Sequence, residues 1–457
     1  MIGIIIVLSA LLLVSISLML LYRNKAYYER YSGEQNWWWL WDHFLNIESK
    51  ASKPYDFAHF DIKDFKMVNE LFGHTEGDIF LEYVGHELLK EPWIKYAVRC
   101  HNDNFAIVAD PLEEKELYEK LNTLFVRLGH MPQDPSYKIF YRCGAVCSDK
   151  AIPAKVLVGD FAKLAQAMGT KQNCTDVVMY TDAMKAEYLR ARKLKAELPL
   201  AIKNNELEVY IQPKYALPYE KLSGGEALVR WNYQNKEIIL PSFFIPHFEK
   251  TGVVDLIDFF VLETVCRKFA EWKQQSLPLF PISINLSRYT IGTLHFLEKA
   301  VQIVEKYGVY PGLIDFELTE TAVYDNQEFV IDIMNKIKGK GFKLSMDDFG
   351  TGYSSLSLLQ KMPLDTLKID KGFVDGIETD ESGSKGQIIL KNILSMTKSM
   401  NITSLSEGVE TEKQKDVLKG WGCEIIQGFY YNKPLNLSEY EDLLEKQKVD
   451  TMKNTTQ

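Results

Sequence analysis

The chain has 457 residues and a formal net charge of −9 at neutral pH. This length predicts two or three domains, and the acidic balance excludes a nucleic-acid-binding protein that works by neutralising phosphates. The six cysteines form no Cys-x-x-Cys pair, so we expect reduced thiols and no structural zinc.

The first segment of the chain is strongly apolar. Residues 2–22 carry no charge, and about 20 helical residues cover the roughly 30 Å hydrocarbon core of a bilayer. A cleaved signal peptide is the alternative, but the start Met-Ile-Gly-Ile has no basic residue. Basic residues follow the segment instead, at Arg23, Lys25 and Arg30. The positive-inside rule therefore predicts a single-pass transmembrane helix in the cytoplasmic (inner) membrane, with the later domains in the cytoplasm.

Residues 23–50 form a juxtamembrane segment that is rich in tryptophan. It contains the sequence Trp-Trp-Trp-Leu-Trp at 37–41. Tryptophan is common at lipid interfaces, so the cluster suits the membrane surface or the pairing of two chains. Packing against the domain that follows is an equally good interpretation, and the sequence does not separate these roles.

Residues 51–185 alternate short apolar strands with amphipathic helices, and we interpret them as one domain. Asn and Asp tolerate the left-handed backbone of a tight turn, so a polar run between two apolar strands predicts a β-hairpin. The predicted elements are a strand at 55–61, helices at 63–72 and 77–89, and a hairpin with strands at 97–100 and 105–109.

The run FDIKDFKMVNELFGHTEGD at 60–78 resembles the opening of a GGDEF domain, the diguanylate cyclase family. The resemblance implies an α/β domain with a mainly antiparallel sheet. It also implies that Asp61 is a metal ligand and that Asn69 and Asp78 hold the guanine of GTP.

The hairpin departs from the family pattern. Where the family has Gly-Gly-Asp/Glu-Glu-Phe, residues 101–105 read His-Asn-Asp-Asn-Phe. Two side chains replace the glycines that let the backbone approach the triphosphate, and neutral Asn104 replaces the glutamate. The inhibitory Arg-x-x-Asp pattern is also missing, since Pro92 and Lys95 stand in its place. We predict a degenerate domain without cyclase activity, which leaves a GTP-binding allosteric module, a dimerising module or a structural spacer open.

A linker helix is predicted at 186–204, within a longer run of strong helix formers from residue 181. We expect Pro199 to break or bend it. The helix is interpreted as a joint that transmits orientation or as a rigid spacer. At the other end of the chain, residues 444–457 are predicted to be a polar, disordered tail.

Between residues 205 and 443, apolar strand patterns recur with helical patterns between them. Eight alternating strands and helices predict a TIM-like (β/α)₈ barrel whose parallel strands all end at one mouth. The predicted strands are 207–212, 224–229, 281–285, 314–318, 343–346, 366–369, 402–405 and 424–426.

Polar residues end or follow most of these strands. Adjacent carboxylates repel each other unless a cation lies between them, and oxygen ligands suit Mg²⁺ and Mn²⁺. Asp347 and Asp348 alone could cap a helix, but the glycines that follow and the other acidic strand ends favour a metal site. The residues are Glu226, Asn285, Glu317, Glu320, Asp347, Asp348, Lys368, Asp370, Glu407, Glu410 and Gln427.

The same residues lie in motifs that together resemble an EAL domain, the family that hydrolyses cyclic di-GMP to linear pGpG. The most specific motif is DDFGTGYSSL at 347–356. The others are EALVRW at 226–231, NLS at 285–287, ELTET at 317–321, LKID at 367–370, EGVET at 407–411 and QGFYYNKPL at 427–435.

The resemblance implies a role for each residue, two Mg²⁺ or Mn²⁺ ions per site and a homodimer through this domain. The implied metal ligands are Glu226, Asn285, Glu317, Asp347, Asp348, Glu410 and Gln427. Lys368 and Glu407 are implied to act on the attacking water, and Glu320 to brace the loop at 347–355. Gln212, Arg230 and Asp370 are implied to contact the substrate.

Together these features predict a membrane-anchored, metal-dependent cyclic di-GMP phosphodiesterase regulated by an inactive GGDEF-like domain. A non-catalytic cyclic di-GMP receptor is the main alternative, and the complete ligand set argues against it. A bifunctional cyclase and hydrolase is a further alternative, which the altered hairpin disfavours.

Overall fold

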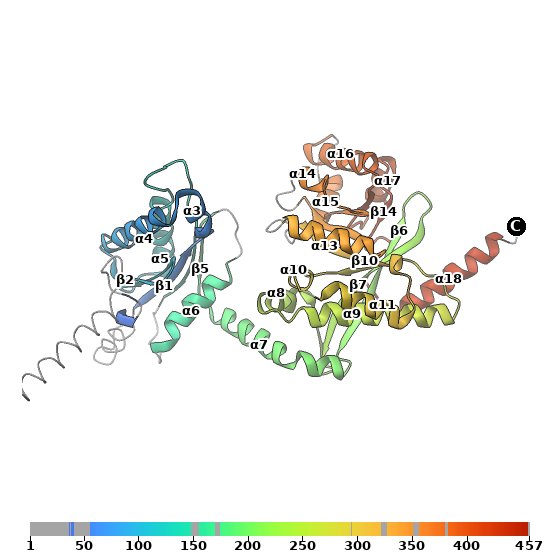
Figure 1. The fold of residues 1–457 in the computed structure, drawn as a ribbon, viewed down its shortest axis with the longest axis horizontal. Coiled ribbons are helices and arrows are strands. Elements are labelled where there is room, and N and C mark those ends of the chain that lie inside the picture. Colours follow the sequence, from blue (N-terminus) through green and yellow to red (C-terminus); the bar gives the residue numbers. More distant parts are fainter. Residues whose placement is uncertain are drawn as a thin grey trace, which may run out of the picture. The chain divides into compact units, whose positions relative to one another are not determined.

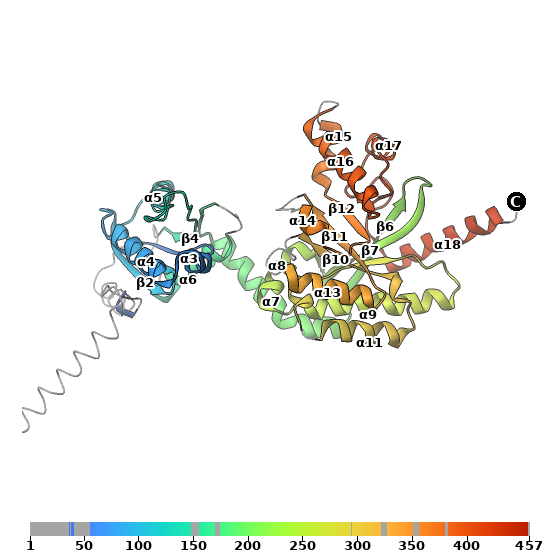
Figure 2. The same cartoon turned by 45° about the horizontal axis from the view of Figure 1, so that its top comes forward.

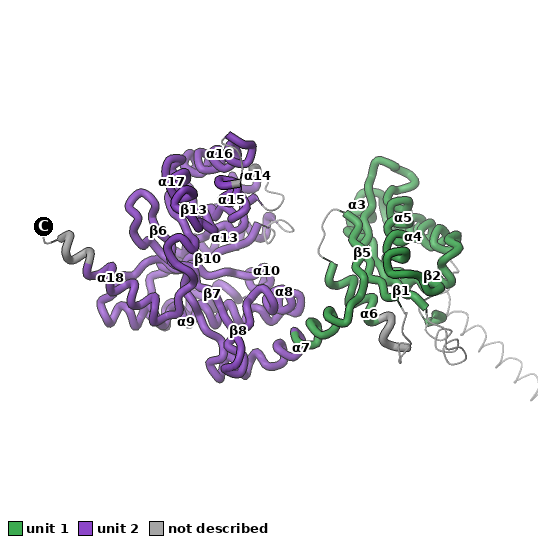
Figure 3. The backbone as a smooth tube through the Cα atoms, turned by 180° about the vertical axis from the view of Figure 1, so that it is seen from behind, with its two compact units in different colours: residues 1–190 green, residues 191–457 purple. Residues whose placement is uncertain are grey.

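The computed structural model describes residues 36, 38–40, 55–147, 155–169, 174–293, 295–320, 327–350, 356–379 and 383–455. The chain divides into two compact units, residues 1–190 and 191–457 (Figure 3). The predicted transmembrane helix at 2–22 lies outside the described residues. Among the helices that the structure does describe, none combines the length and apolar character needed to cross a bilayer.

The first unit is built on a five-stranded sheet with the strand order β2-β3-β1-β4-β5 (Figure 1). All neighbours pair antiparallel except β4 and β5, which confirms the predicted mainly antiparallel sheet. The elements are β1 (Asp56–Ile62), α3 (Phe65–Phe72), α4 (His74–Leu89), β2 (Ile94–His101), β3 (Asn104–Ala109), α5 (Glu114–Arg127), β4 (Tyr141–Val146), α6 (Lys155–Ala167) and β5 (Asp176–Met179).

Alternate residues of the central strand β1 face two separate apolar layers, as the two-residue period of a strand requires. Phe60 packs with residues of α4 and α5 such as Phe80 and Leu121. Phe57 lies in the other layer, which includes Ala162 of α6. The sheet is therefore covered by helices on both faces.

The described part of the tryptophan segment packs on this unit. Leu40 is buried in the same layer as Phe57, and the Trp39 ring lies 5.6 Å from the ring of Tyr96. The side chain of Trp38 is 67% exposed. Packing on the following domain is therefore the role that Trp39 and Leu40 take, while residues 37 and 41 lie outside the described residues.

The joint between the units is one helix, α7 (Asp182–Lys203), and Pro199 lies inside it. The helix is therefore not broken at Pro199, and the alternative of a bend there stays a prediction. Leu194 and Leu198 of this helix are buried in the core of the second unit. Proline cannot donate a backbone hydrogen bond to the helix, and the packing of the two leucines compensates for this loss. The end of α7 is therefore part of the barrel domain.

The second unit is a closed eight-stranded barrel, and each predicted strand overlaps one observed strand. The strand order β15-β6-β14-β13-β12-β11-β10-β9-β7-β8 is closed by pairing of β6 with β7. The strands are β6 (Leu207–Ala216), β7 (Lys221–Tyr233), β8 (Glu237–Ile239), β9 (Ile282–Asn285), β10 (Ile314–Thr319), β11 (Lys343–Phe349), β12 (Thr366–Ile369), β13 (Thr403–Ser406), β14 (Ile425–Ile426) and β15 (Leu435–Asn436).

One strand of the barrel runs against the others, which corrects the prediction of an all-parallel barrel. β6 pairs antiparallel with both β7 and β14. Only residues 217–220 separate β6 from β7, and a parallel connection needs a crossover of a dozen or more residues. A short turn therefore forces this pair into a hairpin.

Helices cover the outside of the barrel, with α9, α11 and α13 along the strands in Figures 1 and 2. Large apolar residues such as Phe316 and Trp231 fill the space between strands and helices. The helices are α8 (Pro241–Thr251), α9 (Asp255–Gln274), α10 (Arg288–Ile291), α11 (Phe296–Tyr307), η1 (Pro311–Leu313), α13 (Gln327–Gly339), α14 (Leu356–Leu359), α15 (Lys371–Thr379), α16 (Lys385–Ser399) and α17 (Glu412–Gly420).

The predicted polar tail begins inside a helix, α18 (Leu437–Thr455), so disorder from residue 444 is wrong. Tyr440 and Leu444 are both buried. Residues four apart lie on one face of a helix, so this pair anchors α18 to the barrel. All six cysteines are free thiols, as predicted.

Candidate active site

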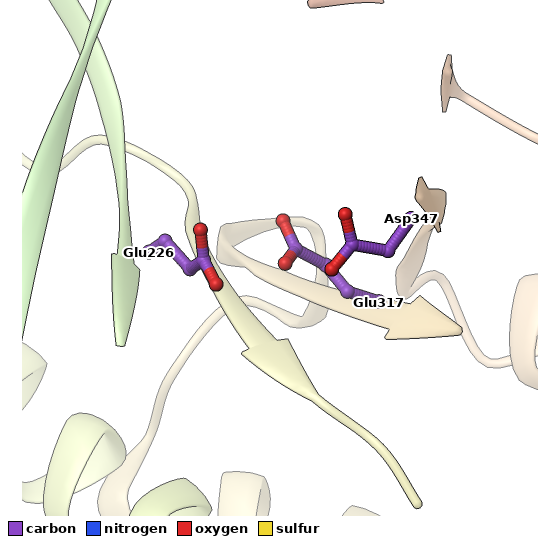
Figure 4. Close-up of side chains that lie close together, drawn as sticks. All are labelled: Glu226, Glu317 and Asp347. Carbon is purple, nitrogen blue, oxygen red and sulfur yellow. The ribbon is translucent and has the colours of Figure 1, made fainter. Parts of the chain in front are cut away.

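Three acidic residues from three barrel strands converge inside the mouth of the barrel (Figure 4). Glu226 of β7, Glu317 of β10 and Asp347 of β11 each offer an oxygen within 4.8 Å of the others. Glu226 and Glu317 are buried. Parallel strands bring their carboxyl ends to one edge, which explains why residues so far apart in the sequence meet here.

A β-bulge allows the side chains of two consecutive aspartates, Asp347 and Asp348, to point into this site. Neighbouring residues of a regular strand face opposite sides of a sheet, but the pairing of β11 with β12 shifts register after Met346. Asp348 takes a left-handed backbone with φ 55°, and the bulge re-aims its side chain. Asp347, Asp348 and Glu407 then form a second group with oxygens within 4.8 Å of one another. The two groups share Asp347.

Lys368 of β12 is paired with four carboxylates of these groups. Its ammonium lies 2.7 Å from oxygens of Glu317 and Glu407, 3.0 Å from Asp347 and 3.3 Å from Glu226. The side chain is 1% exposed. Burial by itself lowers the pKa of Lys368, but the surrounding carboxylates outweigh it and raise the pKa well above its usual value. Lys368 therefore stays charged.

The pKa values of Glu407, Asp347 and Glu317 differ, because burial raises each value and nearby lysines lower it to a different extent. Burial raises the pKa of Glu407 to about 8 and that of Asp347 to about 6, although Lys368 opposes both shifts. Burial also raises the pKa of Glu317, but Lys214 and Lys368 outweigh it and lower the value to about 2. Glu317 is thus a permanent anion, while Glu407 exchanges its proton near neutral pH.

Two amide side chains complete the wall of the site. Asn285 donates a hydrogen bond to Glu226 at 2.9 Å, and Gln427 donates to the other Glu226 oxygen at 2.7 Å and to Gln212 at 3.2 Å. The Oε1 atom of Gln427 is buried and has no hydrogen-bond partner among the described residues. The predicted residues Gln212, Asn285 and Gln427 are therefore all beside Glu226.

Glu320 lies at the base of the loop that follows β11. Its Oε2 accepts a hydrogen bond of 3.3 Å from the backbone amide of Gly350, while Oε1 is buried without a partner among the described residues. Gly350 has φ 98°, and a Cβ there would lie 2.4 Å from the ring of Phe373. Residues 351–355 of this loop lie outside the described residues, so only the contact with Gly350 is observed and the bracing role stays a prediction.

Three predicted site residues have other contacts. Glu410 forms an ion pair of 2.6 Å with Lys371 and belongs to neither acidic group. Asp370 accepts a hydrogen bond of 2.8 Å from the amide of Gly372. Arg230 is half-buried and donates to the carbonyl of Val229 at 2.8 Å. The metal role of Glu410 and the substrate roles of Asp370 and Arg230 remain predictions.

Sequence reasoning missed one charged residue in the site, Lys214. Its ammonium lies 2.7 Å from Glu317, and its side chain is buried. A signal was present, because Lys214 stands two residues after Gln212 in an apolar strand. The two-residue period of a strand places both on the same face.

The donors present suit a pair of divalent cations. All acidic ligands offer hard oxygens, as Mg²⁺ and Mn²⁺ prefer. Glu226, Glu317 and Asp347 would hold one ion, and Asp347 and Asp348 the other, with Glu407 beside it. The unpartnered oxygen of Gln427 is a further buried acceptor in the same wall.

The residues predicted to bind GTP in the first unit have partners within the chain. Asp61 of β1 forms two contacts with the guanidinium of Arg142, at 2.6 and 3.3 Å. Asp78 lies 4.0 Å from Arg99. Asn69 packs so closely on Gly77 that a Cβ there would lie 2.0 Å from its amide oxygen. Only residues 102 and 103 separate the two hairpin strands.

Comparison with known families agrees with both parts of this geometry. Residues 195–434 match the EAL domain family, and residues 40–151 match the family described as diguanylate cyclase, GGDEF domain. The first match covers more than half of the chain. The chain belongs to the EAL domain family and carries a GGDEF domain on the N-terminal side of its EAL domain.

Curated relatives extend over both domains. The chain is 26% identical over 403 residues to cyclic di-GMP phosphodiesterase NbdA of Pseudomonas aeruginosa, covering 85% of this chain and 50% of the relative. It is 27% identical over 382 residues to bifunctional diguanylate cyclase/cyclic di-GMP phosphodiesterase MucR of the same species, covering 82% and 55%. The chain thus spans about half the length of these relatives.

Solved structures agree with the fold. The PaMucR phosphodiesterase in complex with c-di-GMP is 31% identical, with a TM-score of 0.51, and covers 54% of this chain and 99% of its own. The helix-GGDEF-EAL part of Vibrio cholerae LapD, bound to c-di-GMP, has a TM-score of 0.61 and covers 91% and 98%. Its 17% identity makes it a likeness of fold alone.

Proposed function

We propose that this chain is a metal-dependent phosphodiesterase that hydrolyses cyclic di-GMP to linear pGpG. The observation that carries the proposal is the pair of acidic groups that share Asp347 around Lys368. Five carboxylates there face two ammonium groups, and such an excess of negative charge in a buried place favours bound divalent cations. The relatives named as cyclic di-GMP phosphodiesterases support this substrate.

The residues of the site divide the chemistry between them. When bound, two divalent cations activate water and stabilise charge on the phosphoryl oxygens. Glu407, with a pKa raised to about 8 by burial, is suited to accept a proton from the attacking water near neutral pH. Lys368, 2.7 Å from Glu407, holds this carboxylate in place. The guanidinium of Arg230 suits a substrate phosphate.

The test is hydrolysis of cyclic di-GMP by the purified full chain in detergent, with Mg²⁺ or Mn²⁺. We expect linear pGpG as the product and no turnover after Glu226→Ala or after chelation of the metal. Tight binding of cyclic di-GMP without turnover in the unaltered chain would contradict the proposal and make the protein a receptor. The Asp347 groups argue against that alternative, because a receptor does not need them.

We also propose that residues 2–22 anchor the chain in the inner membrane with both domains in the cytoplasm. The apolar, uncharged segment and the basic residues after it support this placement. The check is fractionation of cells that express the full chain or a variant lacking residues 2–22. The full chain is expected in the membrane fraction and the shortened chain outside it.

The GGDEF domain is proposed to be a regulator without cyclase activity. The ion pair of Asp61 with Arg142 and the side chains at residues 101 and 102 support this role. Incubation with GTP and Mg²⁺ is expected to give no cyclic di-GMP, and detection of product would contradict it. A change in hydrolysis rate on adding GTP would make the domain a GTP sensor, and gel filtration would test the proposed homodimer.

A further inference from the structure

The interior of the barrel beneath the acidic groups is polar. Barrel interiors are usually filled by branched apolar side chains. Here Lys214 of β6, Ser283 of β9, Asp315 of β10 and Ser345 of β11 are all buried, and hydrogen bonds join them. Burying a charge costs folding free energy unless the charge is paired, so the buried Lys214 and Asp315 need partners.

Hydrogen bonds lead from Lys214 through Ser283 to Asp315, which also accepts one from Ser345. The ammonium of Lys214 donates to Ser283 at 2.5 Å and to Oε1 of Glu317 at 2.7 Å. Ser283 in turn donates to Oδ2 of Asp315 at 2.8 Å, and Ser345 donates to the same oxygen at 2.6 Å. The hydroxyl groups of Ser283 and Ser345 thus both donate to Asp315, and the Ser283 oxygen accepts from the ammonium of Lys214.

The reversed strand β6 makes this arrangement possible. Lys214 pairs with Gly224 of β7, and Gln212 of the same strand pairs with Glu226. Lys214 therefore enters the barrel one side-chain layer below the Glu226 level. The glycine opposite it has no side chain to occupy that layer, and the long lysine stem reaches past β7 and β9 to Glu317 on β10.

Both oxygens of Glu317 are thereby fixed. Lys214 holds Oε1, and Lys368 holds Oε2 at 2.7 Å. The Glu317 side chain is 0% exposed, so it has no water to replace a lost partner. Lys368 also forms ion pairs with Glu226, Asp347 and Glu407, whereas among the described residues Lys214 forms an ion pair with Glu317 alone.

We propose that Lys214 is a positioning residue that fixes the carboxylate of Glu317 for binding a divalent cation. Lys214 touches neither substrate nor water in this role, and Ser283 and Asp315 hold its ammonium in place. The inference rests on the proposed metal-dependent function. Residues that orient a metal ligand typically change metal affinity about 10- to 100-fold when they are removed.

The test measures Mn²⁺ binding directly, by the electron paramagnetic resonance signal of free Mn²⁺ titrated with the full chain in the absence of substrate. We expect Lys214→Met to weaken binding at least about tenfold. At saturating Mn²⁺ the KM for cyclic di-GMP should stay unchanged, since Lys214 does not contact it. Lys214→Arg, which keeps the positive charge and donors, should bind Mn²⁺ within about threefold of the unaltered chain.

A matched control is Lys268→Met. Lys268 is a partly buried lysine of the barrel domain that, like the buried Lys214, pairs with a glutamate, here Glu441 at 3.0 Å, but it lies on the outer helix α9. It should lower thermal stability without changing Mn²⁺ affinity. If Lys214→Met gives no cooperative unfolding transition, Lys214→Gln replaces it with the same expectation, because an amide can satisfy Ser283 but cannot balance Glu317.

Two results would overturn the inference. Mn²⁺ binding as tight in folded Lys214→Met or Lys214→Gln as in the unaltered chain would make the role purely structural. Equal losses in the Met and Arg variants would show that packing, not charge, decides the effect. Absence of Mn²⁺ binding by the unaltered chain is a different result, since it would contradict the proposed metal dependence itself.

Discussion

The two domains each carry an acidic strand end that the sequence associates with metal binding, but they balance its charge in opposite ways. In the GGDEF domain, Asp61 is paired with Arg142 at 2.6 Å. In the barrel, the five carboxylates of the two acidic groups share the ammonium groups of Lys368 and Lys214. Asp61 thus has a cationic partner of its own, whereas the acidic groups of the barrel retain an excess of negative charge.

This difference shows that carboxylates at strand ends can have a different charge balance in two domains of one chain. A guanidinium gives a carboxylate the charge and the hydrogen bonds that a cation would otherwise supply. The hairpin beside Asp61 has also lost the glycines that would admit a triphosphate. At the barrel mouth, by contrast, the carboxylates of the described residues outnumber the ammonium groups beside them, and we propose that divalent cations balance this excess of negative charge.

The largest effect is expected at Asp347, which belongs to both acidic groups. Asp347→Ala should lower kcat for cyclic di-GMP by at least about 10³-fold, because ligands of both cations are lost together. Steady-state hydrolysis at saturating Mn²⁺ measures it. Asp332→Asn is the control, since Asp332 is an exposed partner of Lys336 on α13, and it should leave kcat unchanged. Substantial turnover in Asp347→Ala would mean that the acidic groups are not the catalytic site.

The next effect is expected at Glu407. Glu407→Gln should lower kcat about 10²- to 10⁴-fold, the usual contribution of a general base, with little change in binding of cyclic di-GMP. In the unaltered enzyme at limiting Mn²⁺, activity should fall as pH drops below about 8, where the raised pKa of Glu407 lets it gain a proton. The pH profile of the variant should lose this limb, and a profile that keeps it would assign the proton to another group.

A smaller effect is expected on the stability of the metal-free protein as the pH changes. The pKa values of Glu407 and Asp347 are raised to about 8 and about 6, so the metal-free folded state binds protons more tightly than the unfolded chain. Its stability should therefore fall as pH rises from about 4 to 8. Mn²⁺ binds the ionised carboxylates, so the rise in Tm that it causes should be larger at pH 8 than at pH 6.

This shift is measured by thermal unfolding with and without Mn²⁺ at both pH values. A ligand at 100 times its Kd adds about 2.7 kcal/mol, which for a barrel of this size corresponds to a Tm rise of roughly 5–10 °C. Equal shifts at the two pH values would show that proton release is not linked to metal binding here.

The smallest effect is expected at Arg142 in the GGDEF domain. Its side chain is 46% exposed, so Arg142→Met should change the free energy of unfolding by no more than about 1 kcal/mol and leave hydrolysis of cyclic di-GMP unaltered. Because the hairpin lacks its glycines, the variant should still make no cyclic di-GMP from GTP. Appearance of cyclase activity would show that Arg142 alone had silenced the domain.

Local patterns were enough to predict the barrel strands and most of the site. Each acidic residue lies at or just after a strand, and parallel strands bring such positions together whatever the sequence distance. Glu226, Glu317, Asp347 and Glu407 meet for this reason. The reversal of β6 was not predicted, because only the structure shows that residues 217–220 alone separate β6 from β7, too few for a crossover.

Other features depend on partners that are distant in the sequence, and only the tertiary structure decided them. Asp61 and Arg142 are 81 residues apart, so their ion pair could not be predicted from the motif around Asp61. Trp39 packs against Tyr96, and helix α7 continues through Pro199 while Leu198 beside it is buried in the barrel core. Local propensity does not describe these contacts. The bulge at Asp348 is a matter of register between two strands.

The sequence by itself thus determined which residue types stand at the strand ends and hence the class of site. The tertiary structure decided how the charges are balanced, because a buried ion pair depends on distances across the fold rather than along the chain. Lys214 is the clearest case, since it lies 103 residues from Glu317 in the sequence and 2.7 Å from it in space.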